Sequence, residues 1–346
     1  MKAIKMIFLL ALILGVFVGC QAKDEVNEAV KSEDTARNAF KVAMVTNSGG
    51  VNDKGFNESA WNGLQRTQSE LGFEVGYIES QLESDFLTNL ETLYEQGNDM
   101  IWGIGYFMED VLMEAAERNP DQMYGGIDIY FPNPPENLVG VQFKEYEAAF
   151  LVGYIAGKMT ETDKVGFVGG MEIPPVLRYQ YGFMSGVKKA NPDCEIKVQY
   201  ANNFLDVALG KTIANQMYQN DIDIIFPAAG ATGTGCIESA KDNDKYIIGV
   251  DLDQYELAPD NIITSAMKNV DQAIFTISNE FTKSGEYASG NVAFGLKEGA
   301  VGISPNSDKH VPQEILDEVN QIKEDIISGA LSIPENKEAY DALYNQ

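Results

Sequence analysis

The feature that most constrains the fold is an alternation of short apolar runs with amphipathic stretches from residue 41 onward. Between the runs, apolar residues recur at helical spacing, as in residues 57–71 and 205–217. Continuous apolar strands that alternate with helices are typical of parallel sheets covered on both faces, so the sequence predicts an α/β protein. The expected strands are residues 41–46, 73–80, 100–105, 123–128, 138–143, 164–170, 195–201, 222–229 and 246–251.

The number of strands indicates how many sheets to expect. About nine strands over about 250 residues favour two doubly wound sheets, since a single core of this size tends to divide. A single barrel of eight strand–helix units is the alternative, and the uneven spacing of the runs fits it less well. In doubly wound sheets, ligands bind beyond the carboxyl ends of the strands. Residues that follow the strands are therefore the first candidates for a site.

The N-terminus has the pattern of an export signal. Within residues 1–19, two lysines precede an apolar run that is too short to span a bilayer comfortably. Gly19 followed by Cys20 resembles a bacterial lipoprotein signal, in which Cys20 is lipidated; a plain secretory signal is the alternative. The polar residues 20–39 are expected to form a flexible tether. We therefore expect a lipid-anchored protein on the extracytoplasmic side of the cell membrane.

Charge and rare residues exclude several classes of function. The 346 residues include 25 Lys and Arg against 52 Asp and Glu, a formal net charge of −27, so phosphate backbones would be repelled and nucleic acid is not an expected partner. The single histidine, His310, excludes sites that need two. Cys194 and Cys236 have no metal-site spacing and are expected to be buried free thiols. No cofactor and no metal are expected.

Polar, charged and aromatic side chains follow the expected strands and open the next helices. The set contains amides, carboxylates, one ammonium and aromatic rings, without a nucleophile–base pair, which indicates a binding cleft in a protein that is not an enzyme. The candidate ligand-binding residues are Asn47, Phe56, Asn57, Asp128, Phe226, Gly230, Asp251 and Lys268.

Five motifs resemble those of one protein family. They are VTNSGGVNDKGFNESAWNGL (45–64), VGFVGGMEIPPVLRYQYGFMSGVKKANP (165–192), PAAGATGTG (227–235), GVDLDQ (249–254) and TSAMKNVD (264–271). In this order they are similar to the basic membrane protein (Bmp) family, the substrate-binding lipoproteins of ABC importers for nucleosides, of which purine-nucleoside binders are the best known. The resemblance implies a type I periplasmic binding protein fold, with two Rossmann-like lobes joined by a multi-strand hinge.

The resemblance implies a role for each candidate that binds the base. Phe56 resembles the aromatic residue on one face of the base and Phe226 the one on the other face. Asn57 matches an amide of the family, and Asp128 resembles the carboxylate that reads the base edge. Many members have Asp where this chain has Asn47, and because an amide also donates, base preference is expected to differ here.

For the sugar, the resemblance implies that Gly230 lies in the glycine-rich loop beside it and that Asp251 and Lys268 form the pair that binds the ribose hydroxyls. A carboxylate can accept both hydroxyls of a cis-diol, and such charge-assisted bonds are stronger than neutral ones. Two other residues are expected to be structural. Arg178 is interpreted as part of an ion pair, with a place facing the cleft as the alternative, and Asp53 as a brace of the first loop.

The expected organisation follows from these assignments. After the signal peptide and the tether, the first lobe comprises residues 40–144 with about 268–295. The second comprises residues 145–267 with about 296–334, and residues 335–346 form a C-terminal tail.

The expected function is capture of adenosine, guanosine or inosine and its delivery to an ABC permease with a cytoplasmic ATPase. Two alternatives stay open: the same receptor role for a sugar or another small polar ligand, and a nucleoside-processing enzyme.

Overall fold

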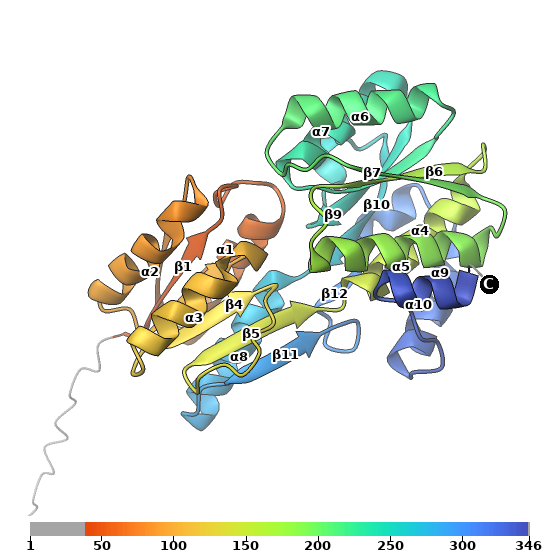
Figure 1. The fold of residues 1–346 in the computed structure, drawn as a ribbon. Coiled ribbons are helices and arrows are strands. Elements are labelled where there is room, and N and C mark those ends of the chain that lie inside the picture. Colours follow the sequence, from red (N-terminus) through yellow and green to blue (C-terminus); the bar gives the residue numbers. More distant parts are fainter. Residues whose placement is uncertain (1–38, 345–346) are drawn as a thin grey trace, which may run out of the picture. The chain divides into compact units, whose positions relative to one another are not determined.

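In the computed structural model, the structure is described for residues 39–344, which form two six-stranded sheets with helices on both faces of each (Figure 1). The signal peptide, Cys20 and the tether expected from the sequence lie outside these residues. The prediction of two doubly wound sheets is confirmed, and the single barrel is excluded because neither sheet closes on itself. Within residues 39–344, no helix combines the length and apolarity needed to cross a bilayer.

The first lobe is built on an all-parallel sheet with strand order β11-β5-β4-β3-β1-β2. Successive residues of a strand point to opposite faces, so Val42 and Met44 enter the core beneath α1 and α8, while Ala43 and Val45 enter the core beneath α2 and α3. The elements are β1 (Lys41–Thr46), α1 (Phe56–Leu71), β2 (Glu74–Glu79), α2 (Phe86–Glu95), β3 (Met100–Ile104), α3 (Glu109–Arg118), β4 (Met123–Ile127), β5 (Leu138–Phe143), α8 (Val270–Ser284) and β11 (Gly290–Phe294).

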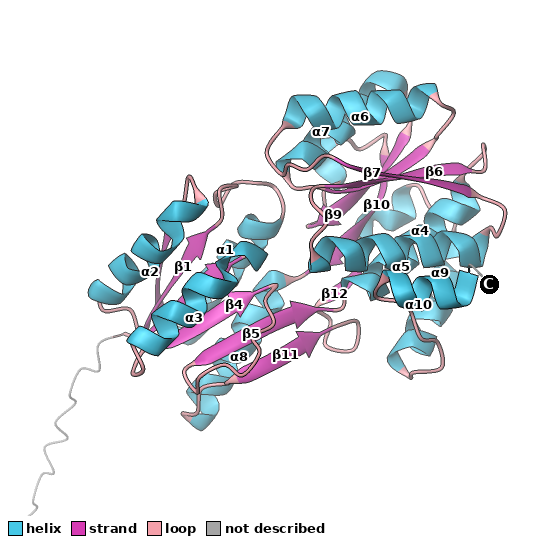
Figure 2. Cartoon of the chain, in the orientation of Figure 1, coloured by secondary structure: helices cyan, strands magenta, loops and turns pink. Residues whose placement is uncertain are grey.

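The second lobe has the strand order β12-β10-β9-β8-β6-β7, in which only the short β12 is antiparallel among the described strands (Figure 2). Helices α4 and α5 cover one face, and α6 and α7 the other. The elements are α4 (Glu145–Met159), β6 (Lys164–Gly169), α5 (Pro174–Ala190), β7 (Glu195–Tyr200), α6 (Val207–Gln219), β8 (Ile224–Ala228), α7 (Ala231–Asn243), β9 (Tyr246–Asp251), β10 (Ile262–Lys268), β12 (Val301–Ile303), α9 (Gln313–Ile327) and α10 (Lys337–Tyr344).

Helices α4 and α5 approach each other closely because glycines lie at their contact. A Cβ built on Gly186 would lie 2.0 Å from the carbonyl oxygen of Phe150, and one on Gly153 would lie 2.2 Å from that of Phe183. Any larger residue would force the two backbones apart. This close contact fixes the first turn of α4, which carries Glu145, against α5, which carries Arg178.

The chain passes between the lobes three times within the described residues, at 143–145, 268–270 and 294–301. The first crossing joins β5 to α4, the second joins β10 to α8, and the third joins β11 to β12. Each lobe is therefore assembled from separate stretches of the sequence. The residues at the crossings are placed between the two lobes by topology alone.

Each of the nine predicted strands is present, with ends within two residues of the prediction. The structure adds β10, β11 and β12, of which β11 is half-exposed and β12 has three residues, so neither carries a long apolar run. Residues 337–344, within the expected C-terminal tail, form α10, whose buried Tyr340 packs on Tyr181. Cys194 and Cys236 are buried free thiols, as predicted.

Candidate functional site

A cavity of about 320 Å³ opens between the two lobes, at the carboxyl ends of strands from both sheets. Its volume is at the lower end of the range for small-molecule pockets, which begins at about 300 Å³. Seven of the eight candidate residues line it; they are Asn47, Phe56, Asn57, Asp128, Gly230, Asp251 and Lys268. The exception is Phe226.

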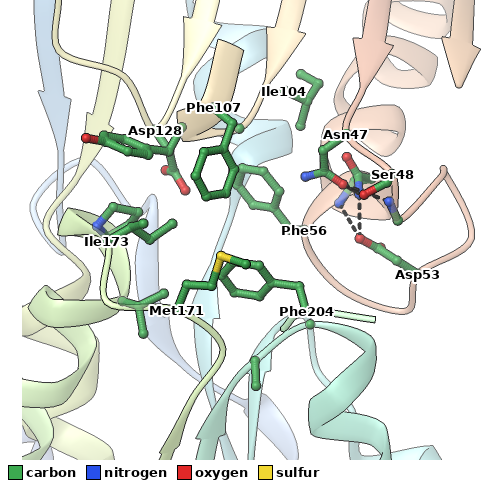
Figure 3. A pocket seen from close by; sticks show the side chains of 18 of the residues that line it. Asn47, Ser48, Asp53, Phe56, Ile104, Phe107, Asp128, Met171, Ile173 and Phe204 are labelled. Carbon is green, nitrogen blue, oxygen red and sulfur yellow. Dashed lines mark hydrogen bonds between the residues drawn. The ribbon is translucent and has the colours of Figure 1, made fainter. Parts of the chain in front are cut away.

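Two aromatic side chains from opposite lobes face the cavity. Phe56 is the first residue of α1, and Phe204 lies in the loop between β7 and α6. Figure 3 shows the two rings on opposite sides of the cavity, with Phe107 beside Phe56 and Met171 beside Phe204. These apolar walls suit a flat ring system that is enclosed on both faces.

Phe226 does not have the place that the sequence reading gave it. Its ring is fully buried in the core, 5.7 Å from the ring of Tyr179 and 5.3 Å from that of Phe183. Phe226 lies inside the predicted strand 222–229, and β8 continues to Ala228, so the cavity begins two residues after Phe226. Phe204 was missed, although it follows the predicted strand 195–201 and the strand-end rule could have found it.

At one end of the cavity, amide and carboxylate side chains form a closed set of hydrogen bonds. Asn57 Nδ2 donates to Asn47 Oδ1 at 2.9 Å and to Asp53 Oδ2 at 2.8 Å. Asp53 also accepts from the backbone N–H groups of Gly55, Asn57 and Glu58, so it caps and braces the start of α1, as the sequence indicated. These bonds leave the carbonyl oxygen of Asn57 buried without a hydrogen-bond partner.

Asn47 has the complementary arrangement. Its Oδ1 accepts from Asn57 Nδ2 and from the backbone N–H of Gly49 at 2.9 Å. Its amide nitrogen is turned the other way, near Gly105 at the wall of the cavity. This end of the cavity therefore has a donor on Asn47 and a buried acceptor on Asn57 that the protein leaves unpaired.

At the other end, Lys268 is buried among carboxylates and rings. Its ammonium donates to Asp128 Oδ2 at 2.5 Å and lies 3.0 Å from Glu145 Oε1. It also lies 4.8 Å from the centre of the Phe56 ring. Burial lowers the pKa of Lys268, but the surrounding carboxylates more than offset this and raise it above its usual value. Lys268 therefore stays protonated.

The Lys268 ammonium bonds Asp128 and Glu145, and the expectation that Lys268 and Asp251 together bind the ribose hydroxyls stays a prediction. The structure also puts Asp128 beside Lys268, and Figure 3 shows it on the far side of Phe56 from Asn47, away from the amide end. The expected contact of Asp128 with the base edge stays a prediction. One of its oxygens, Oδ1, is buried without a hydrogen-bond partner.

Asp128 and Asp251 share a backbone conformation that few residues adopt. Their φ angles are 67° and 64°, in the left-handed region. Asp and Asn tolerate this region better than other side chains, and such residues cluster at functional sites. Both follow or end a strand, β4 and β9 respectively, so the turn of the backbone directs each carboxylate into the cavity.

Asp251 is a carboxylate whose ionisation is disfavoured. Burial raises its pKa to about 7, and the charges of Asp128 and Asp53 act in the same direction. The charge of Lys268 and a hydrogen bond from the Tyr179 hydroxyl, 3.1 Å from Asp251 Oδ1, oppose the rise. Because Oδ2 has no such donor from the protein, the ionised group can accept hydrogen bonds from a ligand.

Two further contacts join the parts of the site. Arg178 Nε donates to Glu145 Oε2 at 2.6 Å, which confirms the ion pair expected for Arg178. Gln254, in the loop after β9, donates from Nε2 to the carbonyl oxygen of Lys54 in the first lobe at 2.9 Å. The two lobes therefore also touch at Gln254, three residues after Asp251.

The comparisons with known proteins agree with this geometry. Residues 40–337 match the model of the Bmp family, described as ABC transporter substrate-binding protein, PnrA-like. The chain therefore belongs to the Bmp family. Among its relatives, basic membrane protein A of Borreliella burgdorferi is 41% identical over 99% of both chains. The CD4+ T-cell-stimulating antigen of Listeria monocytogenes is 36% identical, over 96% of this chain and 97% of that protein.

Solved structures show the same fold. The ABC transporter solute-binding protein of Aeropyrum pernix K1 aligns with a TM-score of 0.80 at 28% identity, covering 88% of this chain and 96% of that one. A periplasmic ribose ABC transporter protein of Conexibacter woesei aligns with a TM-score of 0.59 at 12% identity, over 78% and 94%, which supports the fold alone. The chain is thus an ABC-type substrate-binding protein of the Bmp family with a periplasmic-binding-protein-like fold.

The raised pKa of Asp251 predicts a stability effect with a definite sign. Its folded pKa of about 7 lies above the reference value of 3.8, so the stability that Asp251 contributes is lost as pH rises through this window. Asp251→Asn keeps the shape and tolerates the positive φ, and should raise the free energy of unfolding by up to about 4 kcal/mol near pH 8. The gain should shrink toward pH 4, which urea unfolding at both pH values would measure. An equal gain at both would contradict the assignment.

Proposed function

We propose that this protein is a membrane-anchored substrate-binding lipoprotein that captures a purine nucleoside between its two lobes and delivers it to an ABC permease. The observation that carries the proposal is the cavity itself. It has an aromatic ring from each lobe on opposite sides, an amide donor and acceptor at one end, and unpaired carboxylate oxygens at the other. A purine nucleoside has matching parts: a flat base for the aromatic rings, a polar base rim for the amide end, and a sugar with vicinal hydroxyls for the carboxylate end.

The base would lie between Phe56 and Phe204. Stacking of a base on an aromatic side chain contributes ~1–3 kcal/mol in proteins that bind single-stranded nucleic acids. The rim of the base would then meet the Asn47 donor and the Asn57 acceptor. Because the other polar atoms of these amides are used within the protein, a ligand that pairs with both satisfies a buried acceptor that is otherwise unpaired.

The sugar would lie at the carboxylate end. Asp128 Oδ1 and Asp251 Oδ2 are acceptors without a donor from the protein, and ribose hydroxyls are donors. The Lys268 ammonium bonds one oxygen of Asp128 and leaves the other unpaired. Gly230, at the N-terminus of α7, lines the same cavity with a positive φ of 56°.

A phosphorylated ligand is disfavoured by the charges of the site. Asp53, Asp128 and Asp251 line the cavity, and Glu145 lies behind them. Against these four carboxylates the surroundings have two cations, Lys268 and Arg178. A phosphate would add negative charge to a buried region that already has an excess of it. The proposed ligand is therefore the nucleoside rather than the nucleotide.

Capture would operate through closure of the lobes. A ligand shifts an open–closed equilibrium only through contacts that it makes in one state and not in the other. Phe56 and Asn57 lie on the first lobe and Phe204 and Asp251 on the second, so only the closed arrangement brings all four to one ligand. The lipid at Cys20 and the polar tether would keep the protein at the membrane beside the permease and its ATPase.

The proposal is tested by calorimetric titration with adenosine, guanosine, inosine, cytidine and ribose. We expect binding of at least one purine nucleoside and much weaker binding of cytidine and ribose, because only a purine fills the aromatic gap. Tight ribose binding without purine binding would favour the sugar receptor. Conversion of the nucleoside to free base during the titration, detected by chromatography, would favour an enzyme. A mass spectrum of the natively purified protein would show any ligand that it retains.

The two phenylalanines give a matched pair of variants. Phe204→Ala should weaken purine nucleosides and free purine bases alike, by ~1–3 kcal/mol, because it removes one stacking surface. Phe226→Leu should lower the melting temperature, since it alters the packed core, and leave the affinity within about twofold. Calorimetry and thermal denaturation of both variants measure these effects. A loss of affinity in Phe226→Leu with none in Phe204→Ala would contradict the assignment.

The pH dependence of binding follows from the carboxylate end. If ionised Asp251 accepts the ribose hydroxyls, protonation competes with the ligand, and affinity should fall as pH drops below about 7. One proton limits the fall to about tenfold per pH unit. A 2′,3′-dideoxynucleoside lacks these hydroxyls and should show a shallower dependence. Parallel pH profiles for the two ligands would contradict the sugar assignment.

A further inference from the structure

Glu145 is a buried carboxylate that does not line the cavity and has no role in the contacts described for the ligand. It is the first residue of α4, directly after the first crossing between the lobes, and its exposed fraction is 0%. Both of its oxygens are used: Oε2 accepts from Arg178 Nε at 2.6 Å, and Oε1 lies 3.0 Å from Lys268 Nζ. A buried carboxylate with two cationic partners is fully committed to the protein.

The bonds of Glu145 complete a chain of charges that runs between the lobes. Arg178, on α5 of the second lobe, bonds Glu145 at the first crossing. Glu145 in turn lies beside Lys268, the last residue of β10, at the second crossing. Lys268 finally bonds Asp128, after β4 of the first lobe. The signs alternate along the chain, so each member stabilises its neighbours.

The middle of this chain determines which oxygens are left for a ligand. With Glu145 and Asp128 on either side, the Lys268 ammonium divides its donors and takes only one oxygen of Asp128, so Oδ1 stays free. An ammonium without Glu145 would turn fully toward the remaining carboxylates and neutralise them more strongly. Its four-carbon stem is flexible, so its position depends on its partners.

We propose that Glu145 is a positioning residue: it fixes the Lys268 ammonium between the lobes and so leaves Asp128 and Asp251 free to accept the hydroxyl groups of the ligand. Arg178 supports Glu145 from the second lobe by balancing its buried charge. This inference rests on the proposed function for the identity of the ligand, but its electrostatic part concerns the ligand-free protein as well.

The first variant is Glu145→Gln, which keeps the shape and removes one buried negative charge. Affinity for a ribonucleoside should fall about tenfold or more, the scale of losing a hydrogen bond to a charged group, while a 2′,3′-dideoxynucleoside should lose much less. The charged groups that face Asp128 are Lys268, Glu145 and Arg178, and the groups that face Asp251 are Lys268, Asp128, Asp53 and the Tyr179 hydroxyl. Removing Glu145 takes away a charge that raises the pKa of Asp128, so the part of the acidic limb that reports Asp128 should move to lower pH, while the part that reports Asp251 stays near pH 7.

The second variant, Arg178→Met, should act with the opposite sign. Arg178 does not line the cavity, and its charge lowers the pKa of Asp128. Its loss leaves Glu145 balanced by Lys268 alone, so the same limb should move to higher pH. If Glu145 and Arg178 served packing alone, both variants would have a lower melting temperature and the acidic limb of the affinity profile would stay at the same pH in each. If Glu145→Gln does not fold, Arg178→Met and the double variant still carry the test.

Glu147→Gln is the matched control. Glu147 lies two residues further along α4, is also buried, and accepts from the backbone N–H of Leu296 at the third crossing. It pairs with Lys144 rather than with Lys268. Its substitution should therefore lower stability without moving the pH limb or changing the ratio of ribonucleoside to dideoxynucleoside affinity.

A measurement without ligand separates this inference from the proposed function. Carboxyl ¹³C NMR titration of the ligand-free proteins should show Asp128 titrating at lower pH in Glu145→Gln and at higher pH in Arg178→Met. No shift in either variant would overturn the inference, whether or not a nucleoside binds. Shifts as expected, in a protein that binds no purine nucleoside, would overturn the proposed function and retain the positioning role.

Discussion

The arrangement of the site depends on one buried ammonium, Lys268, which lies where the chain passes between its two lobes. Burial alone would favour its neutral form, and only the carboxylates around it keep it charged. Those carboxylates come from a first-lobe strand end and from the first residue of a second-lobe helix. The same charge that stabilises them therefore also connects the lobes, so the electrostatics of the cavity and the geometry of the crossings cannot be changed separately.

The sequence predicted the fold well because its signals are local. Short apolar runs mark parallel strands wherever both faces of a sheet are covered, and all nine runs form strands. The strand-end rule placed Asn47, Asp128 and Asp251 at one cavity for the same reason. The prediction failed at Phe226 because this residue lies inside β8, which continues through Pro227 to Ala228. Proline is tolerated there since β9 pairs with β8 only at Ile224 and Ile225, before Pro227 is reached.

The partners of the charged residues could not be read from the sequence. Glu145 and Lys268 are 123 positions apart, and an acidic residue in the first turn of a helix ordinarily serves the helix dipole. Nothing in the neighbouring sequence distinguishes Glu145 from Glu147, which accepts a hydrogen bond from the backbone N–H of Leu296 at the third crossing. The pairing of Lys268 with Asp128 instead of Asp251 likewise depends on how two sheets meet. The family resemblance supplied residue types for the site, while the structure supplied which atoms are already bonded and which are free.

The three crossings at 143–145, 268–270 and 294–301 also limit how the lobes can move. Peptide units are planar and do not lengthen, so three short connections of fixed reach oppose sliding and shear, each of which would require at least one of them to extend. Rotation about an axis through the connections is the remaining degree of freedom. Every approach of the lobes then follows the same arc, and a solute of the right shape meets both walls in a reproducible alignment.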